Sequence, residues 1–154
     1  MKLFLECKPD ETLAIALGVP RRAIIHSHGK GRISNNLKKH VDVLAMVDDD
    51  LGATDTPTLR QFAELSSEGD VVLKVDRSTK NRLVVICPRL EPWVLKTAKD
   101  ADIKMEDHGL PGKLRDLDEV INFRLVQLAA LVKELVERKS PRILRLRSFL
   151  ADTI

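Results

Sequence analysis

Carboxylates follow two apolar segments of this chain, at the points where β-strands would end. Glu6 follows the short run Leu3–Leu5, and Asp48 and Asp50 follow the run "VDVLAMV" at 41–47. Like charges that are held close together repel one another, and a divalent cation is their natural compensator. Oxygen ligands in an open arrangement suit Mg²⁺ or Mn²⁺, which would polarise a phosphoryl group and activate water. Glu6, Asp48 and Asp50 therefore predict a metal site for phosphoryl chemistry.

Four further acids near these segments have two interpretations. Acids after strands are also common as helix caps and turn formers. We favour that structural role for Glu11 and Asp49, and we predict Asp10 as the N-cap of a helix. Glu91, which follows the apolar run "LVVIC" at 83–87, fits either role equally well. Glu11 and Glu91 are retained as accessory residues of the predicted site.

The acids meet only if the elements around them form one sheet. Short apolar runs bounded by turn residues predict strands at 2–6, 23–27, 41–47, 71–75 and 83–87. Apolar periodicity predicts helices at 11–17, 32–40, 58–65, from about 92 and from about 113 to 139, with a short basic helix after Pro141. This alternation predicts an α/β fold with a mainly parallel sheet, in which the 2–6 and 41–47 strands are neighbours. Sites in such sheets form at the carboxyl ends of the strands.

For three segments the sequence predicts either two alternatives or no regular structure. The connection 76–81 fits a hairpin loop or a wider connection, and 102–112 is predicted to be irregular. The apolar stripe at 117–135 fits either core or a dimer seam, and we favour core because an α/β sheet needs helices on both faces. A helical extension of about 96–154 then follows a core of about 1–95, within a single domain 1–154.

Five basic residues are the candidates for contacts to phosphate. They are Lys30, Arg32, Arg21, Arg22 and Lys38. We expect them to flank the acidic site, because a polyanion needs local positive charge to approach a group of carboxylates. The loop "HGKG" at 28–31 is not a P-loop, because Ile24 stands where the first Gly is needed and Gly31 follows Lys30.

Composition narrows the class of protein. The chain has 154 residues, a net charge of +3, two cysteines and no tyrosine. The absence of tyrosine excludes a tyrosine nucleophile from this chain. Cys7 and Cys87 fit no metal-ligand spacing and are typical of a reduced, cytoplasmic protein. No segment is long enough for a membrane span, and the N-terminal apolar run is too short for a signal peptide.

The histidines and the tryptophan have ordinary structural explanations. His26 and His28 alternate along a strand end, but a zinc site would need further ligands that the sequence does not supply. Trp93 is predicted to pack in the core with its N–H hydrogen-bonded.

Two of these segments carry a family resemblance. "LFLECKPDE" is similar to the opening of OLD-type Toprim domains, and "AMVDDDLG" resembles their Asp-x-Asp motif with its trailing Gly. The resemblance covers roughly residues 2–95. Two departures are that Cys7 stands where the family usually has Gly, and that Glu11 lies one residue later than the second acid of the common pattern.

The resemblance implies a Toprim-like fold and a function. Glu6 would act as general acid/base or ligand, and Asp48 and Asp50 would hold Mg²⁺ or Mn²⁺. The implied activity is a nuclease that uses water on DNA or RNA. The alternative is a non-catalytic Toprim-fold binding or regulatory module that acts with partner proteins. A homodimer and an ATPase partner both stay open.

Overall fold

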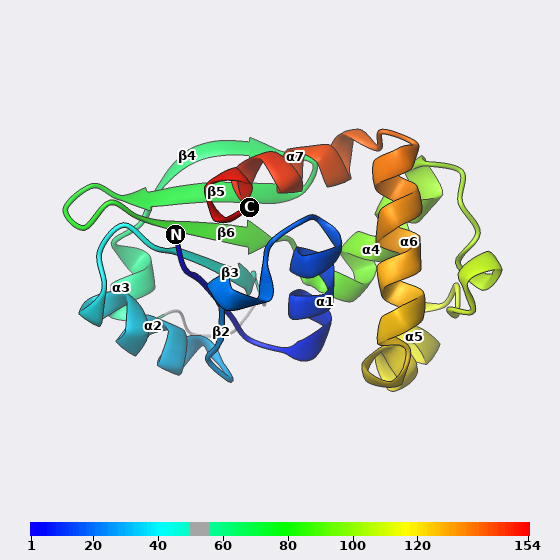
Figure 1. Cartoon of the computed structure of the whole chain (residues 1–154), viewed down its shortest axis with the longest axis horizontal. Helices are drawn as coiled ribbons and strands as arrows, with labels where there is room; N and C mark the ends of the chain where they lie inside the picture. Colours follow the sequence, from blue (N-terminus) through cyan, green and yellow to red (C-terminus); the bar gives the residue numbers. More distant parts are fainter. Residues whose placement is uncertain (50–55) are drawn as a thin grey trace.

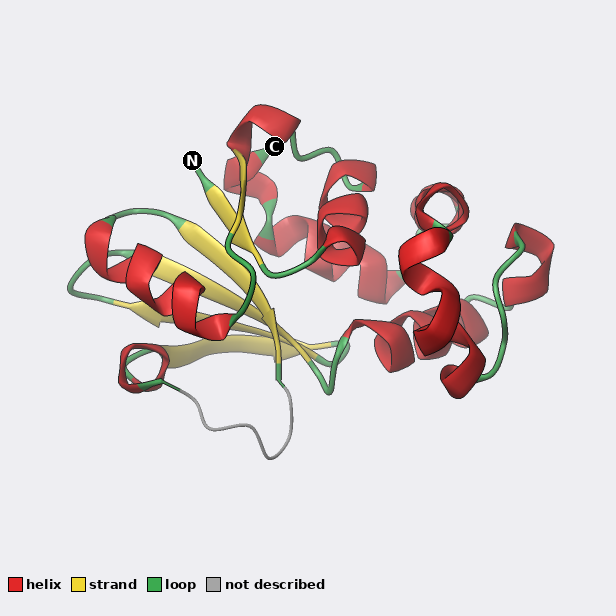
Figure 2. Ribbon diagram, turned by 90° about the horizontal axis from the view of Figure 1, so that it is seen from below, coloured by secondary structure: helices red, strands yellow, loops and turns green. Residues whose placement is uncertain are grey.

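The computed structural model describes residues 1–49 and 56–154. Its described residues form a six-stranded sheet with helices on both faces (Figures 1 and 2). The strands are β1 Leu3–Leu5, β2 Ile24–His26, β3 Leu44–Asp48, β4 Ala63–Glu68, β5 Val71–Asp76 and β6 Asn81–Ile86. The α-helices are α1 Lys8–Ala16, α2 Lys30–Lys39, α3 Pro57–Arg60, α4 Leu90–Asp100, α5 Leu114–Val120, α6 Leu125–Glu137 and α7 Pro141–Phe149.

The sheet is mixed but mainly parallel, which confirms the predicted α/β class. Its strand order is β2-β1-β3-β6-β5-β4. The four strands β2, β1, β3 and β6 run parallel, whereas β5 and β4 are antiparallel to their neighbours. β1 pairs with β3, as predicted, with Leu5 opposite Met46. The connection between β5 and β6 is a hairpin, which settles the alternative left open for residues 76–81.

β3 is apolar because both of its faces are covered. Leu44 and Met46 belong to the larger core, and Ala45 and Val47 belong to the smaller one. Helices α1, α4, α5, α6 and α7 contribute to the larger core, and α2 and α3 contribute to the smaller one. In Figure 2, α2 and α3 accordingly lie across the sheet from the C-terminal helices. A parallel strand buried on both faces reads as a continuous apolar run, which is the signal that β3 carries.

The helix predicted at 58–65 is wrong in its second half. α3 is a single turn, with Thr56 Oγ1 accepting a hydrogen bond from the Leu59 N–H at 3.3 Å, and it ends at Arg60. The following residues form β4, which is mostly exposed and pairs with β5. Ala, Glu and Leu favour helices, but backbone pairing along the edge of the sheet overrides that local preference here.

The long helix predicted at 113–139 is also wrong, because it is broken near its middle. α5 ends at Val120, a 3₁₀ turn covers Ile121–Phe123, and α6 begins at Leu125. α5 packs against α4, whereas α6 packs against α1. One straight helix could not make both contacts, so the chain changes direction between them. The stripe itself is core, as predicted, since Leu117, Ile121, Leu128, Leu131, Val132 and Leu135 are buried.

None of the helices in the described ranges is both long and apolar enough to cross a membrane.

Candidate functional site

Neighbouring parallel strands end together at one edge of the sheet. Leu5 at the end of β1 lies opposite His26 of β2 and Met46 of β3. Asp48, the last residue of β3, lies opposite Ile86, the last residue of β6. Glu6 directly follows β1, so the structure brings Glu6 and Asp48 to the same edge. Both side chains have an oxygen that is shielded from solvent.

Asp10 is a further acid near these strand ends, although the sequence predicted it only as the N-cap of a helix. The N-cap of α1 is Cys7, so the prediction that Asp10 caps the helix is wrong. Pro9 and Asp10 instead lie in the first helical turn, and Asp10 is only 2% exposed. The sequence does contain a signal for this burial, because Asp10 shares the helical stripe of Leu13, Ala14 and Leu17. That spacing puts Asp10 on the face of α1 that packs on the sheet.

The electrostatics of Asp10 show that acids crowd together here. Burial and, to a smaller extent, the negative charges of Glu6 and Glu91 raise the pKa of Asp10 to about 7, although hydrogen bonding to Cys7 opposes the change. Burial also raises the pKa of the Cys7 thiol, and the charges of Asp10 and Asp48 act in the same direction. Glu6, Asp10, Asp48 and Glu91 are therefore close enough to influence the same few groups, and Cys7 stays a neutral thiol.

The two predicted accessory acids already have basic partners. Glu11 Oε2 lies 2.7 Å from His26 Nε2, and Glu11 Oε1 lies 3.3 Å from Arg21 Nη1. Glu91 accepts a hydrogen bond from Arg89 at 2.9 Å. Arg89 in turn makes a bidentate pair with Asp118, at 2.7 and 2.8 Å. Asp10, not Glu11, is thus the acid of α1 that faces the strand ends.

The metal site predicted from Glu6, Asp48 and Asp50 is only partly visible. Asp50 lies outside the described residues. Within residues 1–49 and 56–154, no group of three His, Cys, Asp or Glu side chains is arranged to hold a metal ion. Glu6 and Asp48 offer the hard oxygen donors that Mg²⁺ and Mn²⁺ prefer, and a third ligand has to come from elsewhere.

Four of the five predicted phosphate contacts divide between the two ends of the parallel strands. Lys30 begins α2 and lines a small cleft with Asp48 and Asp49, and exposed Arg32 lies in the same first turn. Arg21 pairs with Glu11. Arg22 lines a hollow with Met1 and Lys2, before β1 begins, and Lys38 lies in the last turn of α2. Lys30 and Arg32 therefore accompany the strand-end acids, whereas Arg22 and Lys38 lie toward the opposite edge.

The remaining candidates have structural roles. Trp93 is buried, and its indole N–H donates to the Gly69 carbonyl at 2.9 Å, which confirms the prediction for this residue. The rings of His26 and His28 stack edge to face at 5.6 Å, and His26 Nε2 is engaged by Glu11.

Compared with models of known protein families, with curated proteins and with solved structures, the chain matches none. The similarity to Toprim domains therefore rests on the two short motifs and stays a prediction. What the geometry offers chemically is a set of acids from α1, β1 and β3 at one sheet edge, with Lys30 beside them.

Proposed function

We propose that this protein hydrolyses phosphodiester bonds in nucleic acid with the help of Mg²⁺ or Mn²⁺, as a Toprim-type nuclease. The observation that supports it most is the crowding of Glu6, Asp10 and Asp48 at the ends of adjacent parallel strands. Burial and neighbouring negative charge already oppose the ionisation of Asp10, so a cation at this edge would relieve repulsion that the fold itself creates.

The proposal gives separate tasks to the side chains at this edge. Glu6 and Asp48, with Asp50 as the third ligand, would hold the cation, which would supply charge for the phosphoryl oxygen and lower the pKa of water. Glu6 would also accept a proton from the attacking water. Asp10, whose pKa is raised to about 7 by burial and by the charges of Glu6 and Glu91, adds a further acid to this edge. Lys30 and Arg32 contact the backbone of the substrate, which positions it without reading bases.

A second candidate function is a nucleic-acid-binding or regulatory module without catalysis. One observation favours it, since Lys30 and Arg32 in the first turn of α2 accompany the acidic edge, and binding to a nucleic-acid backbone needs only such cations. Such a module keeps the fold and the basic residues around the acidic edge but binds no divalent cation there. Fold alone does not decide between the two functions.

The experiment is cleavage of single- and double-stranded DNA and RNA by the wild type and Glu6→Gln, with Mg²⁺, with Mn²⁺ and with EDTA. Glu64→Gln is the matched control, because Glu64 is exposed on β4. We expect a metal-dependent product from the wild type and Glu64→Gln, and a loss of at least about 100-fold in Glu6→Gln. Salt-sensitive binding without cleavage of any substrate would support the binding module instead.

A further inference from the structure

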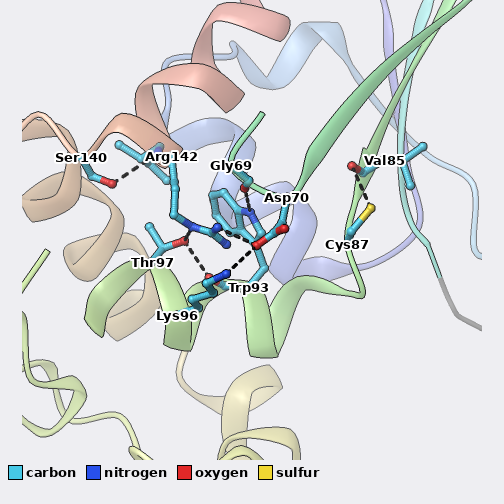
Figure 3. Close-up of polar contacts among 10 residues, drawn as sticks. Gly69, Asp70, Val85, Cys87, Trp93, Lys96, Thr97, Ser140 and Arg142 are labelled. Atoms are coloured by element: carbon cyan, nitrogen blue, oxygen red, sulfur yellow. Dashed lines mark hydrogen bonds and ion pairs between the residues drawn. The ribbon is translucent and has the colours of Figure 1, made fainter. Parts of the chain in front are cut away.

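A hollow of about 430 Å³ opens beside the acidic edge, between β6, the β4–β5 turn, α4 and α7. We call it the Arg142 hollow, and its main lining residues are Asp49, Asp70, Cys87, Trp93, Lys96 and Arg142. Asp49 and Cys87 directly follow β3 and β6, so the hollow adjoins the strand ends that carry the acids. Figure 3 shows Arg142 and Lys96 converging on Asp70.

Arg142 is held rigidly at the side of this hollow. It is 9% exposed, and its guanidinium lies over the Trp93 ring at 5.3 Å from the centroid. Nε donates to Thr97 Oγ1 at 2.8 Å, and Nη1 donates to Asp70 Oδ2 at 2.7 Å. Nη2 is buried and has no hydrogen-bond partner among the described residues. A guanidinium that is buried, oriented and left with an unused donor is typical of a binding group for an anion.

The hollow itself is lined by two cations and two carboxylates, and the adjoining cleft adds one net positive charge. Lys96 Nζ lies 3.1 Å from Asp70 Oδ2, the same oxygen that Arg142 uses, so two cations share one carboxylate oxygen. Asp49, at the rim, also lines the smaller cleft that contains Lys30 and Lys74. With Asp48 of that cleft included, the two linings together contain four cations and three carboxylates. Lys96 is exposed enough to swing toward an incoming anion.

Two other kinds of ligand chemistry fit the hollow poorly. Trp93 is 1% exposed and covered by Arg142, so it offers no face on which a base could stack. Burial and the charge of Asp49 raise the pKa of Cys87 to about 11, so its thiol is not ionised at neutral pH and is a poor nucleophile.

We propose that the Arg142 hollow binds a phosphate monoester, namely the terminal phosphate of a nucleic-acid strand or of a nucleotide. Lys96 and the guanidinium of Arg142 supply the donors, and the phosphate displaces Lys96 from Asp70. The choice of a nucleic-acid end rests on the proposed function, because the hollow adjoins the edge where a strand would be cleaved. Binding of the phosphate itself requires neither cleavage nor a metal.

The test uses the fluorescence of Trp93, which is the only tryptophan in a chain without tyrosine. The full chain is titrated in EDTA with one short single-stranded oligonucleotide in three forms, with a 5′-phosphate, a 3′-phosphate or hydroxyl ends. A nucleoside monophosphate and inorganic phosphate serve as competitors. We expect a saturable signal with at least one phosphorylated form, at an affinity about tenfold or more above that of the hydroxyl form. Equal affinities for all three forms would overturn the proposal.

Variants separate binding from structural effects. Lys96→Gln and Arg142→Gln should each remove the preference for phosphate, whereas Lys99→Gln on α4 and Arg145→Gln on α7 should keep it. Arg145 is a matched control because it pairs with Glu68 and lies over Phe149, outside the lining of the hollow. Arg142→Gln disturbs a buried group, so this variant can fail to fold. In that case Lys96→Gln, which changes an exposed residue, tests the proposal alone. An unchanged preference for phosphorylated oligonucleotides in Lys96→Gln would contradict the proposal.

The outcome is independent of the proposed nuclease activity. A preference for phosphorylated oligonucleotides in EDTA, without metal-dependent cleavage, would support the phosphate site in the hollow and contradict the proposed nuclease function. Cleavage by the wild type with no preference for phosphorylated ends keeps the function and removes the site. Competition by the monophosphate, but not by inorganic phosphate, would assign the site to a nucleotide rather than to any phosphate group.

Discussion

Asp10 and Asp70 are two acids of the same type whose surroundings change their pKa in opposite directions. Burial raises the pKa of Asp10, and the charges of two other acids, Glu6 and Glu91, act in the same direction, to a value of about 7. Hydrogen bonds from Arg142 and then Lys96 lower the pKa of Asp70, on the turn between β4 and β5. The fold thus provides cations for an acid that fastens α7 and α4 to the sheet, whereas the charges that shift the pKa of Asp10 are those of other acids. Acids that raise one another's pKa are what a cation-binding site would contain.

Of the substitutions that test this comparison, Asp10→Asn should have the largest effect, and it should change how the free energy of unfolding depends on pH. Because the pKa of Asp10 is raised in the folded protein, its proton is lost from the unfolded chain first, and stability falls as pH rises from 3.8 to about 7. Asp10→Asn removes this loss. We expect a free energy of unfolding above that of the wild type at pH 8, by roughly 4 kcal/mol at most.

Denaturant unfolding at pH 4 and pH 8, without divalent ions, measures this difference. The two proteins should be similar at pH 4 and clearly separated at pH 8. A variant that is less stable than the wild type at pH 8 would show that Asp10 is held by favourable contacts, and the contrast with Asp70 would disappear.

Asp70→Asn should act in the opposite direction. It leaves the buried guanidinium of Arg142 without its counterion, so we expect a loss of about 1–3 kcal/mol at pH 7, reduced from a fully buried pair because Asp70 is 45% exposed. The lowered pKa means that this stabilisation is present above 3.8 and is lost as pH falls below it. Chemical unfolding at pH 7 and pH 3 checks both points, and an equal deficit at the two pH values would contradict the role of the charge.

Lys96→Gln should have the smallest effect on stability. Lys96 and Asp70 form an exposed ion pair, and such pairs contribute about 0–1 kcal/mol. The melting temperature should therefore stay within about 2 °C of the wild type at 150 mM salt. A larger drop would mean that Lys96 is structural, which would weaken its use as the clean variant for testing the Arg142 hollow.

The strands of the site could be predicted from sequence because their signals are local. β1 and β3 are short apolar runs that end at an acid, and adjacency in a parallel sheet follows from the alternation of strands and helices. The same logic brought Glu6 and Asp48 to one edge. Asp10 was misplaced because a capping residue and a buried first-turn residue look alike unless the helical stripe is followed back to its start.

The errors elsewhere arise from tertiary contacts. β4 begins with three residues of helical preference, Ala63, Glu64 and Leu65, and its pairing with β5 makes it a strand. The apolar residues keep one helical period across the junction of α5 and α6, so the sequence does not indicate that the helix is broken there. The break forms because the two helices pack against different partners. The Arg142 hollow combines residues that follow β3 and β6 with residues of the β4–β5 turn, α4 and α7. Asp70 and Arg142 alone are 72 positions apart, so no local motif predicts the hollow.

Mn²⁺ binding to the wild type and to Asp48→Asn, measured by titration calorimetry at pH 7.5, tests most directly whether the strand-end acids form a cation site. Asp70→Asn is the control, since Asp70 already has two cationic partners. We predict a saturable heat for the wild type and for Asp70→Asn, no binding to Asp48→Asn, and a melting temperature for Asp48→Asn without metal that equals or exceeds that of the wild type. Equal binding to Asp48→Asn, or no binding to the wild type, would contradict the metal site.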